Sequence, residues 1–423
     1  MNRVFASFAV TAVALASLTG CVVSTEQPPP AEPVTGASYP DDSMHGTVQG
    51  AQESTEAPLH VVAVDAMGHA STTDLLDGTE SRLETLGVPT ALASDGRYVF
   101  ASTLDGLSII DSGMWSWAHG DHFHYYRAAP RSVGTLQGGA QATVTGSALS
   151  TAGGTGVFFR DTGKAVLLDN AELAEGRLKS VFEVDAGVHK GLVAPLGDGA
   201  LVTVAGDNGT SSAVQFIGAS GQPVPGTETE CEDASGSANT PAGLVIGCAG
   251  GALVATVDEA SGGAPHYQRI SYPKGTKAED RAERFGGRKG RTSVAAVAGN
   301  HGAWVLDVRE GTWRRILADV PLLKVSAVDD KEGHVLAVDT SGRVHVQKLN
   351  SNDRPDVSKP LLAKSLEDQE SLAGVELVTD QQRAYVNDPA AGTVHEIAFA
   401  DGARIARKID TAAKPVFMAV TGR

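Results

Sequence analysis

From about residue 57 onward, the hydrophobic pattern of the chain consists of short apolar runs separated by turns. The runs are rich in Val, Ala and Leu, and the breaks contain Asp-Gly, Asn-Gly and Gly-Gly pairs, among 49 glycines in all. The pattern contains no amphipathic segment of normal helical length. Short strands at regular intervals with hairpin turns between them predict an all-β sandwich, barrel or propeller.

A repeating unit within this pattern favours a propeller over a sandwich or a barrel. The unit is an apolar strand, a turn, a second apolar strand, another turn and then an alternating strand, and successive first strands lie about 33 to 51 residues apart. This is the scale of a four-stranded propeller blade. First strands are expected at Thr90–Ala93, Ala142–Val144, Leu192–Ala194, Ala242–Leu244, Ser293–Ala295, Val325–Ala327 and Val375–Leu377.

The two ends of the repeat region complete one further blade. Residues His60–Leu75 read HVVAVDAMGHASTTDL and resemble His334–Leu349, HVLAVDTSGRVHVQKL, but no first strand precedes them. The missing strand is KPVFMAV, Lys414–Val420. A blade shared by both ends leaves no open sheet edge in the ring and brings the prediction to eight blades. Seven is the alternative, because the interval of about 33 residues is irregular.

The N-terminal residues predict export and lipid attachment. Residues 1–20 have the pattern of a lipoprotein signal peptide, with Arg3 before the apolar run Val4–Leu18 and a lipobox that ends at Cys21. The run is too short for a membrane-spanning helix. Cys21 is expected to carry the lipid, at the outer face of a bacterial membrane, on the cell surface or in the periplasm. An ordinary cleaved secretion signal is the alternative.

The next segment, residues 21–56, is rich in Pro, Ser, Thr and Glu and has few large apolar side chains. Such a composition predicts a disordered tether, because the segment cannot bury enough surface to offset its ordering entropy. The predicted domains are therefore the signal peptide, the tether and a propeller over residues 57–423.

The remaining cysteines and the net charge limit the bonds and the partners that can be expected of this protein. Two cysteines remain, Cys231 and Cys248, and an even pair in an exported protein predicts a disulfide, with thiolate ligation of a metal as the alternative. The net charge of −16 argues against nucleic acid and anionic lipid surfaces as partners, and contact with a membrane is expected through the lipid alone.

The stretch AHGDHFHYYRA contains three of the chain's 12 histidines. His122 and His124 are two residues apart, so in an extended strand both imidazoles project from one face with Cα atoms about 6.5–7 Å apart. Two ring nitrogens can then meet a metal at about 2.0–2.1 Å. His119 precedes a Gly-Asp turn signal that can fold it back toward this pair, and Asp121 is a candidate orienting carboxylate or fourth ligand.

Three imidazoles and a carboxylate suit zinc best, although ligand type does not exclude copper or nickel. The alternative is that these histidines cap turns and satisfy buried polar groups. His189, in the loop before a first strand, is a candidate distant ligand. A simple strand count, however, places His119–His124 after a third strand, on the opposite face of the ring. His301 is expected in a hairpin turn.

Enzyme signatures are not found in the sequence. It contains no G-x-S-x-G elbow, no H-E-x-x-H and no phosphate loop followed by a helix. The protein is therefore expected to bind rather than to catalyse. Two alternatives remain open, namely a scaffold propeller that recognises a protein or glycan at the cell envelope without metal, and a propeller lyase or hydrolase with His122 or His124 as general base.

The segment GMWSWAHGDHFHYYRAAPRSVGTL, Gly113–Leu136, resembles the AztD-type zinc metallochaperones, and the likeness extends more loosely from about residue 57 to the end. The resemblance implies an exported or surface-held β-propeller that binds zinc and delivers it to the solute-binding protein of a zinc ABC transporter. It also implies metal binding by His119, His122, His124 and His189. The protein is expected to be a monomer. The sequence departs from the family pattern at Ser235-Gly236, where His-Gly is expected.

Overall fold

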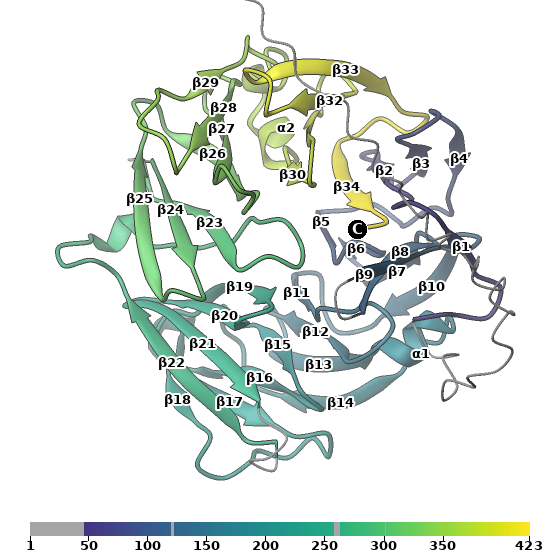
Figure 1. Ribbon diagram of the computed structural model, residues 1–423. Coiled ribbons are helices and arrows are strands. Elements are labelled where there is room, and N and C mark those ends of the chain that lie inside the picture. The colour runs from purple at the N-terminus through teal and green to yellow at the C-terminus, as the bar shows by residue number, and fades with distance from the viewer. Residues whose placement is uncertain (1–45, 120–121, 258–262, 301) are drawn as a thin grey trace, which may run out of the picture. The chain divides into compact units, whose positions relative to one another are not determined.

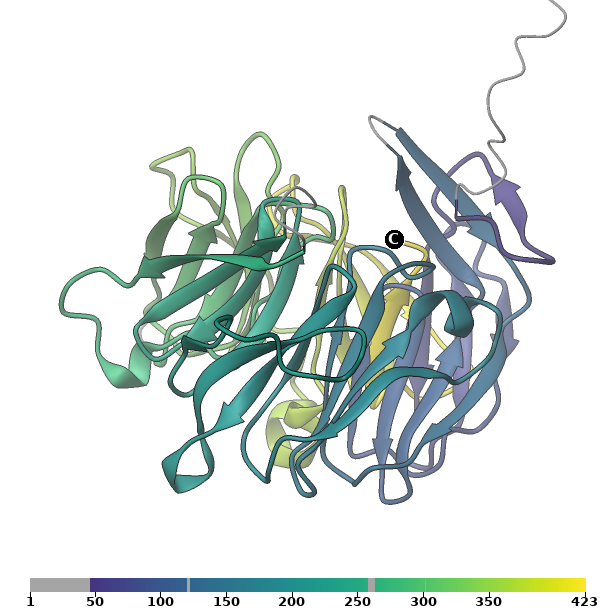
Figure 2. The same ribbon diagram turned by 90° about the horizontal axis from the view of Figure 1, so that it is seen from below.

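The computed structural model describes residues 46–119, 122–257, 263–300 and 302–423. In this part of the chain, eight antiparallel sheets are arranged around a common centre as the blades of a β-propeller (Figure 1). A further three-stranded sheet projects from one face of the ring (Figure 2). The predicted all-β class and the count of eight blades are confirmed.

Each blade extends from an inner strand at the centre of the ring to an outer strand at its edge. In this inner-to-outer order, the first blade contains β34 (Phe417–Thr421), β2 (His60–Val64), β3 (Ala70–Asp74) and β4 (Glu80–Arg82). The second contains β5 (Ala91–Ser94), β6 (Tyr98–Thr103), β7 (Gly106–Asp111) and β10 (Arg131–Leu136). The third contains β11 (Ala142–Gly146), β12 (Gly154–Phe159), β13 (Lys164–Asp169) and β14 (Ser180–Asp185). The fourth contains β15 (Val193–Leu196), β16 (Gly199–Ala205), β17 (Ser211–Ile217) and β18 (Thr229–Glu230).

The fifth blade contains β19 (Ser235–Thr240), β20 (Gly243–Cys248), β21 (Gly251–Val257) and β22 (Pro265–Ser271). The sixth contains β23 (Ser293–Val297), β24 (Gly302–Asp307) and β25 (Thr312–Leu317). The seventh contains β26 (Leu322–Ala327), β27 (His334–Asp339), β28 (Val344–Lys348) and β29 (Asp356–Val357). The eighth contains β30 (Leu377–Thr379), β31 (Ala384–Asp388), β32 (Thr393–Ala398) and β33 (Arg404–Asp410). Short helices α1 (Asn170–Ala174) and α2 (Gln369–Ala373) lie in connections between strands. Within the described residues, no helix is long and apolar enough to cross a membrane.

The first blade joins the two ends of the described chain. Strand β34 pairs antiparallel with β2, and Val420 lies opposite Val61 in the ladder. Val62, Val64 and Ala419 pack with β6 residues of the next blade in one apolar cluster. The expectation that the C-terminal strand supplies the missing inner strand of this blade is confirmed.

The sixth blade has three regular strands, and its inner edge is completed by a bridge between Gly286 and Ala295. Gly286 occupies this inner position because a Cβ atom there would lie 2.1 Å from the carbonyl oxygen of Val325. Ser293–Ala295 was expected as a first strand, and this assignment is wrong because β23 is second from the centre. The irregular interval of about 33 residues before Val325 therefore runs from the second strand of one blade to the first strand of the next, which explains why it is short.

The fifth blade contains a similar correction. Residues Ala242–Leu244 were expected to begin a first strand, but β20 lies second in its sheet and β19 is innermost. The sequence of β19, SGSANT, has no apolar run, and its Ser237 hydroxyl shares a hydrogen bond of 2.8 Å with Thr145 of β11. The inner strand is polar here because it contacts another inner strand near the centre of the ring.

Strand direction divides the connections between two faces of the ring. Because neighbouring strands are antiparallel, the connection after each first strand and after each third strand lies on one face. We call this the hairpin face, and we call the opposite face, at which the first strands begin, the return face. Residues 112–119 and 122–130 lie on the hairpin face, and residues 186–192 lie on the return face.

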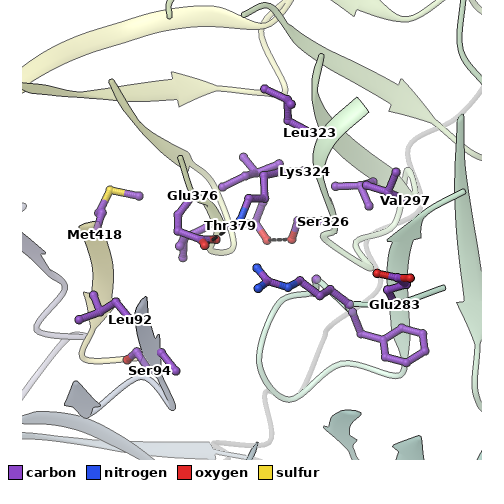
Figure 3. A pocket seen from close by; sticks show the side chains of 18 of the residues that line it. Leu92, Ser94, Glu283, Val297, Leu323, Lys324, Ser326, Glu376, Thr379 and Met418 are labelled. Atoms are coloured by element: carbon purple, nitrogen blue, oxygen red, sulfur yellow. Dashed lines mark hydrogen bonds and ion pairs between the residues drawn. The ribbon is translucent and has the colours of Figure 1, made fainter. Parts of the chain in front are cut away.

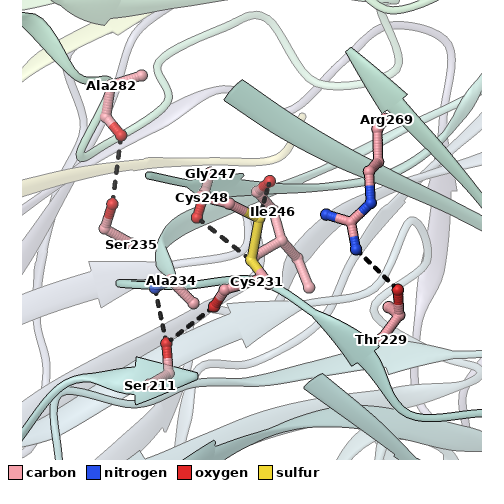
Figure 4. The surroundings of a disulfide bond; sticks show 10 residues. All are labelled: Ser211, Thr229, Cys231, Ala234, Ser235, Ile246, Gly247, Cys248, Arg269 and Ala282. Carbon is pink, nitrogen blue, oxygen red and sulfur yellow. Dashed lines mark hydrogen bonds between the residues drawn. A yellow bond between two sulfur atoms is a disulfide. The ribbon is translucent and has the colours of Figure 1, made fainter. Parts of the chain in front are cut away.

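The Cys231–Cys248 disulfide is present, as predicted. It joins the connection after β18 to the end of β20 and therefore links the fourth and fifth blades (Figure 4). Both cysteines are buried in an apolar cluster that contains side chains from these two blades. Around it, the Ser211 hydroxyl donates to the Cys231 carbonyl at 3.3 Å and accepts from the Ala234 amide at 2.7 Å.

Replacing both cysteines with serine is expected to lower the free energy of unfolding by about 3 kcal/mol, because the bond closes a loop across a sequence separation of 17 residues. Urea unfolding of the soluble domain without Cys21 measures this difference. Reduction of the parent protein should reproduce it. Two free thiols in the denatured, unreduced protein would contradict the assignment.

Part of the segment that composition predicted to be a tether belongs to the folded structure. Residues Gln52–Ser54, inside the segment expected to be a disordered tether, form strand β1 and pair with the projecting sheet. Val48 is buried against Trp115 and Tyr126. The expected boundary at residue 56 is therefore too late in the chain, because pairing with a distant strand orders a segment of polar composition. The signal peptide, Cys21 and the tether up to residue 45 lie outside the described residues.

Candidate metal centre

The histidine-rich stretch forms a β-hairpin inserted between the third and fourth strands of the second blade. Its strands are β8 (Met114–His119) and β9 (His122–Arg127), and β1 pairs with the outer edge of β9. Figure 2 shows this sheet standing away from the ring on the hairpin face. The insertion explains why the strand count placed the cluster after a third strand.

His122 and His124 lie on one face of the hairpin, as their spacing predicted. Their Nε2 atoms are 3.1 Å apart. Two nitrogens that bind one tetrahedral zinc at about 2.0–2.1 Å lie roughly 3.3 Å from each other, so this separation is close to that of a shared metal. The His122 side chain is exposed, and that of His124 is half-buried.

A carboxylate from the N-terminal strand orients His124. The Nδ1 atom of His124 lies 2.8 Å from Glu53 Oε1 of β1. A protonated Nδ1 donates to this carboxylate and leaves the Nε2 lone pair directed at His122. Histidine ligands of metals commonly have such a partner, which fixes the tautomer and raises the basicity of the ring.

The remaining residues of the predicted site are described in part. The backbone register pairs His119 with His122 across the hairpin. Asp121 lies outside the described residues. Among the residues that the structure describes, no group of three or more His, Cys, Asp or Glu side chains is arranged to hold a metal ion. The described portion of the candidate site is therefore His122, His124 and Glu53.

Aromatic side chains fix the base of the hairpin. The rings of Trp115 and Tyr126 stack with centroids 5.3 Å apart, and the Trp115 indole donates to the Gly46 carbonyl at 3.0 Å. The Tyr126 ring is nearly parallel to that of His124 at 6.3 Å. Below them, the Arg97 guanidinium lies 3.9 Å from the centre of the Trp115 ring. These contacts hold the strand that carries the histidines.

The structure does not bring His189 to the hairpin. His189 lies in the connection between β14 and β15, on the return face, and is 3% exposed. Its Nδ1 lies 2.8 Å from the Gly187 carbonyl oxygen and its Nε2 lies 2.8 Å from the Thr203 hydroxyl. Burial lowers the pKa of His189 and keeps the ring neutral. Both ring nitrogens thus have partners inside the fold.

Sequence reasoning missed Glu53. It lies 71 residues before His124 in the chain, in a segment whose composition indicated disorder. The contact depends on β1 pairing with β9, where Glu53 is opposite Tyr126. The local sequence around Glu53 contains no signal for this pairing.

No protein-family model matches the sequence. Two solved structures of AztD from Citrobacter koseri, one described as the apo protein, are similar, with TM-scores of 0.70 and 0.68 at 17% identity. Each similarity covers 86% of this chain and 97% of AztD. This chain has the fold of AztD.

A second propeller also resembles the chain. The dihydro-haem d1 dehydrogenase NirN, solved in complex with DHE, has a TM-score of 0.54 at 16% identity, over 86% of this chain and 75% of NirN. At these identities, both AztD and NirN establish the propeller fold of the chain. A function has to be argued from the site itself.

Proposed function

We propose that this protein binds zinc on the β8–β9 hairpin as cargo and delivers it to another protein. The observation that carries this proposal is the separation of 3.1 Å between the Nε2 atoms of His122 and His124. The resemblance of Gly113–Leu136 to AztD-type metallochaperones and the AztD fold support it. The role is one of binding and transfer, with no catalytic residue assigned.

The proposed ligands are His122 and His124, joined by His119, with Asp121 as the candidate fourth ligand. His119 is included because residues directly opposite each other in an antiparallel ladder have Cβ atoms about 4.5–5.5 Å apart. Zinc would take the place of the hydrogen bond between the two Nε2 atoms, so a neutral His122 would bind it as the tautomer that has its single proton on Nδ1. His189 is not part of the proposed site, because its ring nitrogens are occupied within the return face.

The exposure of the hairpin favours cargo over a structural metal. A structural zinc site is closed by four protein ligands, whereas His122 is exposed on a sheet that stands away from the ring (Figure 2). A receiving protein can approach such a ligand without unfolding any blade. We propose the solute-binding protein of a zinc ABC transporter as the recipient, in line with the AztD resemblance.

We also propose that the propeller works at the outer face of a bacterial membrane, attached through a lipid on Cys21. The lipobox before Cys21 and the polar segment after it support this location. Replacing Cys21 with serine is expected to release the protein into the soluble exported fraction. A variant that stays with the membrane would refute the anchor.

Zinc content and transfer test the proposed function. Purified protein should bind zinc stoichiometrically in an equilibrium competition with a chromogenic chelator. Zinc should then move to the apo solute-binding protein faster than to a free chelator of equal affinity. Absence of zinc binding would overturn the whole proposal, whereas binding with equal transfer rates would overturn the delivery step.

Replacing Glu53 with glutamine is expected to weaken zinc binding about 10–100-fold, the usual cost of losing an outer-shell partner of a ligating histidine. The amide removes the charge that raises the basicity of His124 and leaves β1 otherwise intact. The competition assay measures the change. Glu56→Gln is the matched control, since Glu56 is exposed just beyond β1. Equal affinities in both variants would remove Glu53 from the site.

A further inference from the structure

The cavity at the centre of the propeller has a volume of about 710 Å³ and is lined by charged side chains of both signs. Figure 3 shows that the Lys324 amine pairs with the Glu376 carboxylate, at 2.7 Å, and that the hydroxyls of Ser326 and Thr379 meet, also at 2.7 Å. Four basic and three acidic residues line the cavity in all. This balance selects no ligand by charge. The surface beside the β8–β9 hairpin, in contrast, carries mainly one sign of charge.

The hairpin has an aromatic side, opposite the side that carries His122 and His124. Because side chains alternate along a strand, Phe123 and Tyr125 project from this aromatic side. Their rings are nearly parallel, with centroids 6.4 Å apart, and Phe123 is 56% exposed. A ring so exposed adds little to the apolar core, so the packing of the blades does not explain its position.

The aromatic side of the hairpin is directed toward the first blade. Arg127 and Ser116 project from this side, and they donate to the Asp74 carboxylate at 3.1 Å and to the Gly422 carbonyl at 2.8 Å. The Asp74 carboxylate also accepts the amide of Leu76 at 2.7 Å. Leu76 is 69% exposed in the turn between β3 and β4, on the hairpin face of the ring. Leu76 therefore lies on the same side of the hairpin as the two aromatic rings, and we call these three residues the apolar patch.

Acidic side chains border the apolar patch. Residues 55–59 lead from β1 into β2, and residues 75–80 follow β3; the two segments are adjacent, because the Leu75 amide donates to the Leu59 carbonyl at 2.9 Å. Together they contain three acidic residues, all exposed, and no Lys or Arg. We call these residues, Glu56, Asp77 and Glu80, the acidic rim.

The arginines that reach this region are already paired. Arg127 lies 3.1 Å from Asp74. Arg407 of β33 donates to the Leu75 carbonyl, and its guanidinium pairs with Glu396 at 2.6 Å. The charges of the acidic rim are therefore left for a partner.

We propose that the apolar patch and the acidic rim form the surface at which the recipient of the zinc docks, and that the recipient presents an apolar pocket surrounded by Lys and Arg. The assignment rests on the proposed transfer of zinc from His122 and His124, since a protein that reaches these ligands also covers the aromatic side of the same hairpin. Exposed aromatic anchors within a polar rim are typical of protein interfaces. Opposite charges on the partner raise the rate of encounter.

Charge disfavours the other proteins and surfaces that could cover the patch. A second copy of this chain would bring the same acidic rim, and like charges across an interface are unfavourable. Residues 22–45 of the chain itself contain four acidic residues and no Lys or Arg. An anionic lipid surface is repelled for the same reason. A basic protein surface is the partner that the rim attracts.

Transfer of zinc from the loaded propeller to the apo solute-binding protein should slow as salt is added, because salt screens attraction between opposite charges. With the recipient well below saturation, the rate should fall about tenfold or more between about 0.01 and 1 M salt, where the Debye length shrinks from about 30 to 3 Å. Stopped-flow mixing measures the rate. A rate that is independent of salt, or that rises with it, would overturn the proposal.

Reversing the charge of the rim with Glu56→Lys and Glu80→Lys should slow transfer at low salt about tenfold or more. Glu84→Lys with Asp105→Lys is the matched control, because it makes the same change of net charge at two exposed residues on the return face. The control pair should transfer zinc like the parent. Equal slowing by the two pairs would show that net charge alone acts, and would remove the rim from the docking surface.

Phe123→Ser should raise the recipient concentration needed for half-maximal transfer about tenfold or more, the usual effect of losing an aromatic anchor. Its zinc affinity should match that of the parent in the chelator competition, because the ring lies on the other side of the hairpin from the histidines. Leu76→Ser should act in the same direction from outside the hairpin, which separates lost docking from a distorted hairpin. Leu317→Ser is the control, since Leu317 is 78% exposed at the end of β25 on the return face.

The outcomes separate this proposal from the proposed function. Normal transfer by both Phe123→Ser and Leu76→Ser would overturn the docking surface and leave zinc delivery standing. A parent protein that binds no zinc, or that supplies the recipient no faster than a free chelator, would overturn delivery and this surface together. Sedimentation tests the remaining occupant. A dimer of the parent that Phe123→Ser abolishes would place a second copy on the patch and would refute docking of the recipient there.

Discussion

Replacing His122 and His124 together with alanine should abolish tight zinc binding and leave the propeller folded. Both side chains lie on the projecting hairpin, outside the eight blades, and neither fills the apolar core. The affinity should fall by more than about 100-fold, beyond the cost of losing one outer-shell partner. Without metal, the free energy of unfolding should change by less than about 0.5 kcal/mol per surface substitution.

The competition assay with a chromogenic chelator measures this loss, and His266→Ala is the control. His266 is an exposed histidine on outer strand β22, far in the sequence from the hairpin. The parent protein should also bind zinc more weakly as the pH falls, because protons compete with zinc for the imidazole nitrogens. A double variant that binds zinc as tightly as the parent would place the metal elsewhere.

The fold could be predicted from the sequence wherever strands are apolar. The pair HVVAVD and HVLAVD marked equivalent second strands, and KPVFMAV marked the inner strand that β2 lacks. Two inner positions were missed, because β19 is polar and Gly286 has no side chain. At both places the inner position lies close to another inner strand, so close approach matters more there than apolar burial.

The candidate site was predictable only in its local part. The two-residue spacing of His122 and His124 places both rings on one face of any extended strand, and the structure has them 3.1 Å apart. Glu53 could not be predicted, because its contact arises from tertiary pairing between β1 and β9. For His189, the sequence predicted the local position but not the burial of the side chain. Its position in a loop was evident, but the burial that occupies its nitrogens depends on Thr203 and Phe158 from neighbouring strands.

The hairpin and the second blade meet at a buried ion pair whose loss should destabilise this protein more than any other substitution proposed above. Arg97 is 1% exposed, and its Nε and Nη2 atoms donate to the two carboxylate oxygens of Asp111 at 2.9 and 2.7 Å. Asp111 ends β7, and its carboxylate also accepts the Gly113 amide at 3.0 Å, where the hairpin begins. The pair therefore sets the direction in which the hairpin leaves the blade.

Replacing Arg97 with methionine is expected to lower the free energy of unfolding by about 3–5 kcal/mol, because Asp111 then remains buried without its main partner. Urea unfolding measures the loss. Arg97→Met combined with Asp111→Leu should recover most of it, since an apolar pair of similar volume removes the uncompensated charge. The double variant should bind zinc more weakly than the parent, because the Trp115 ring loses the guanidinium that lies over it and the hairpin base loosens. A single variant destabilised by less than about 1 kcal/mol would show that Arg131, 3.4 Å from the same carboxylate, is sufficient to neutralise Asp111.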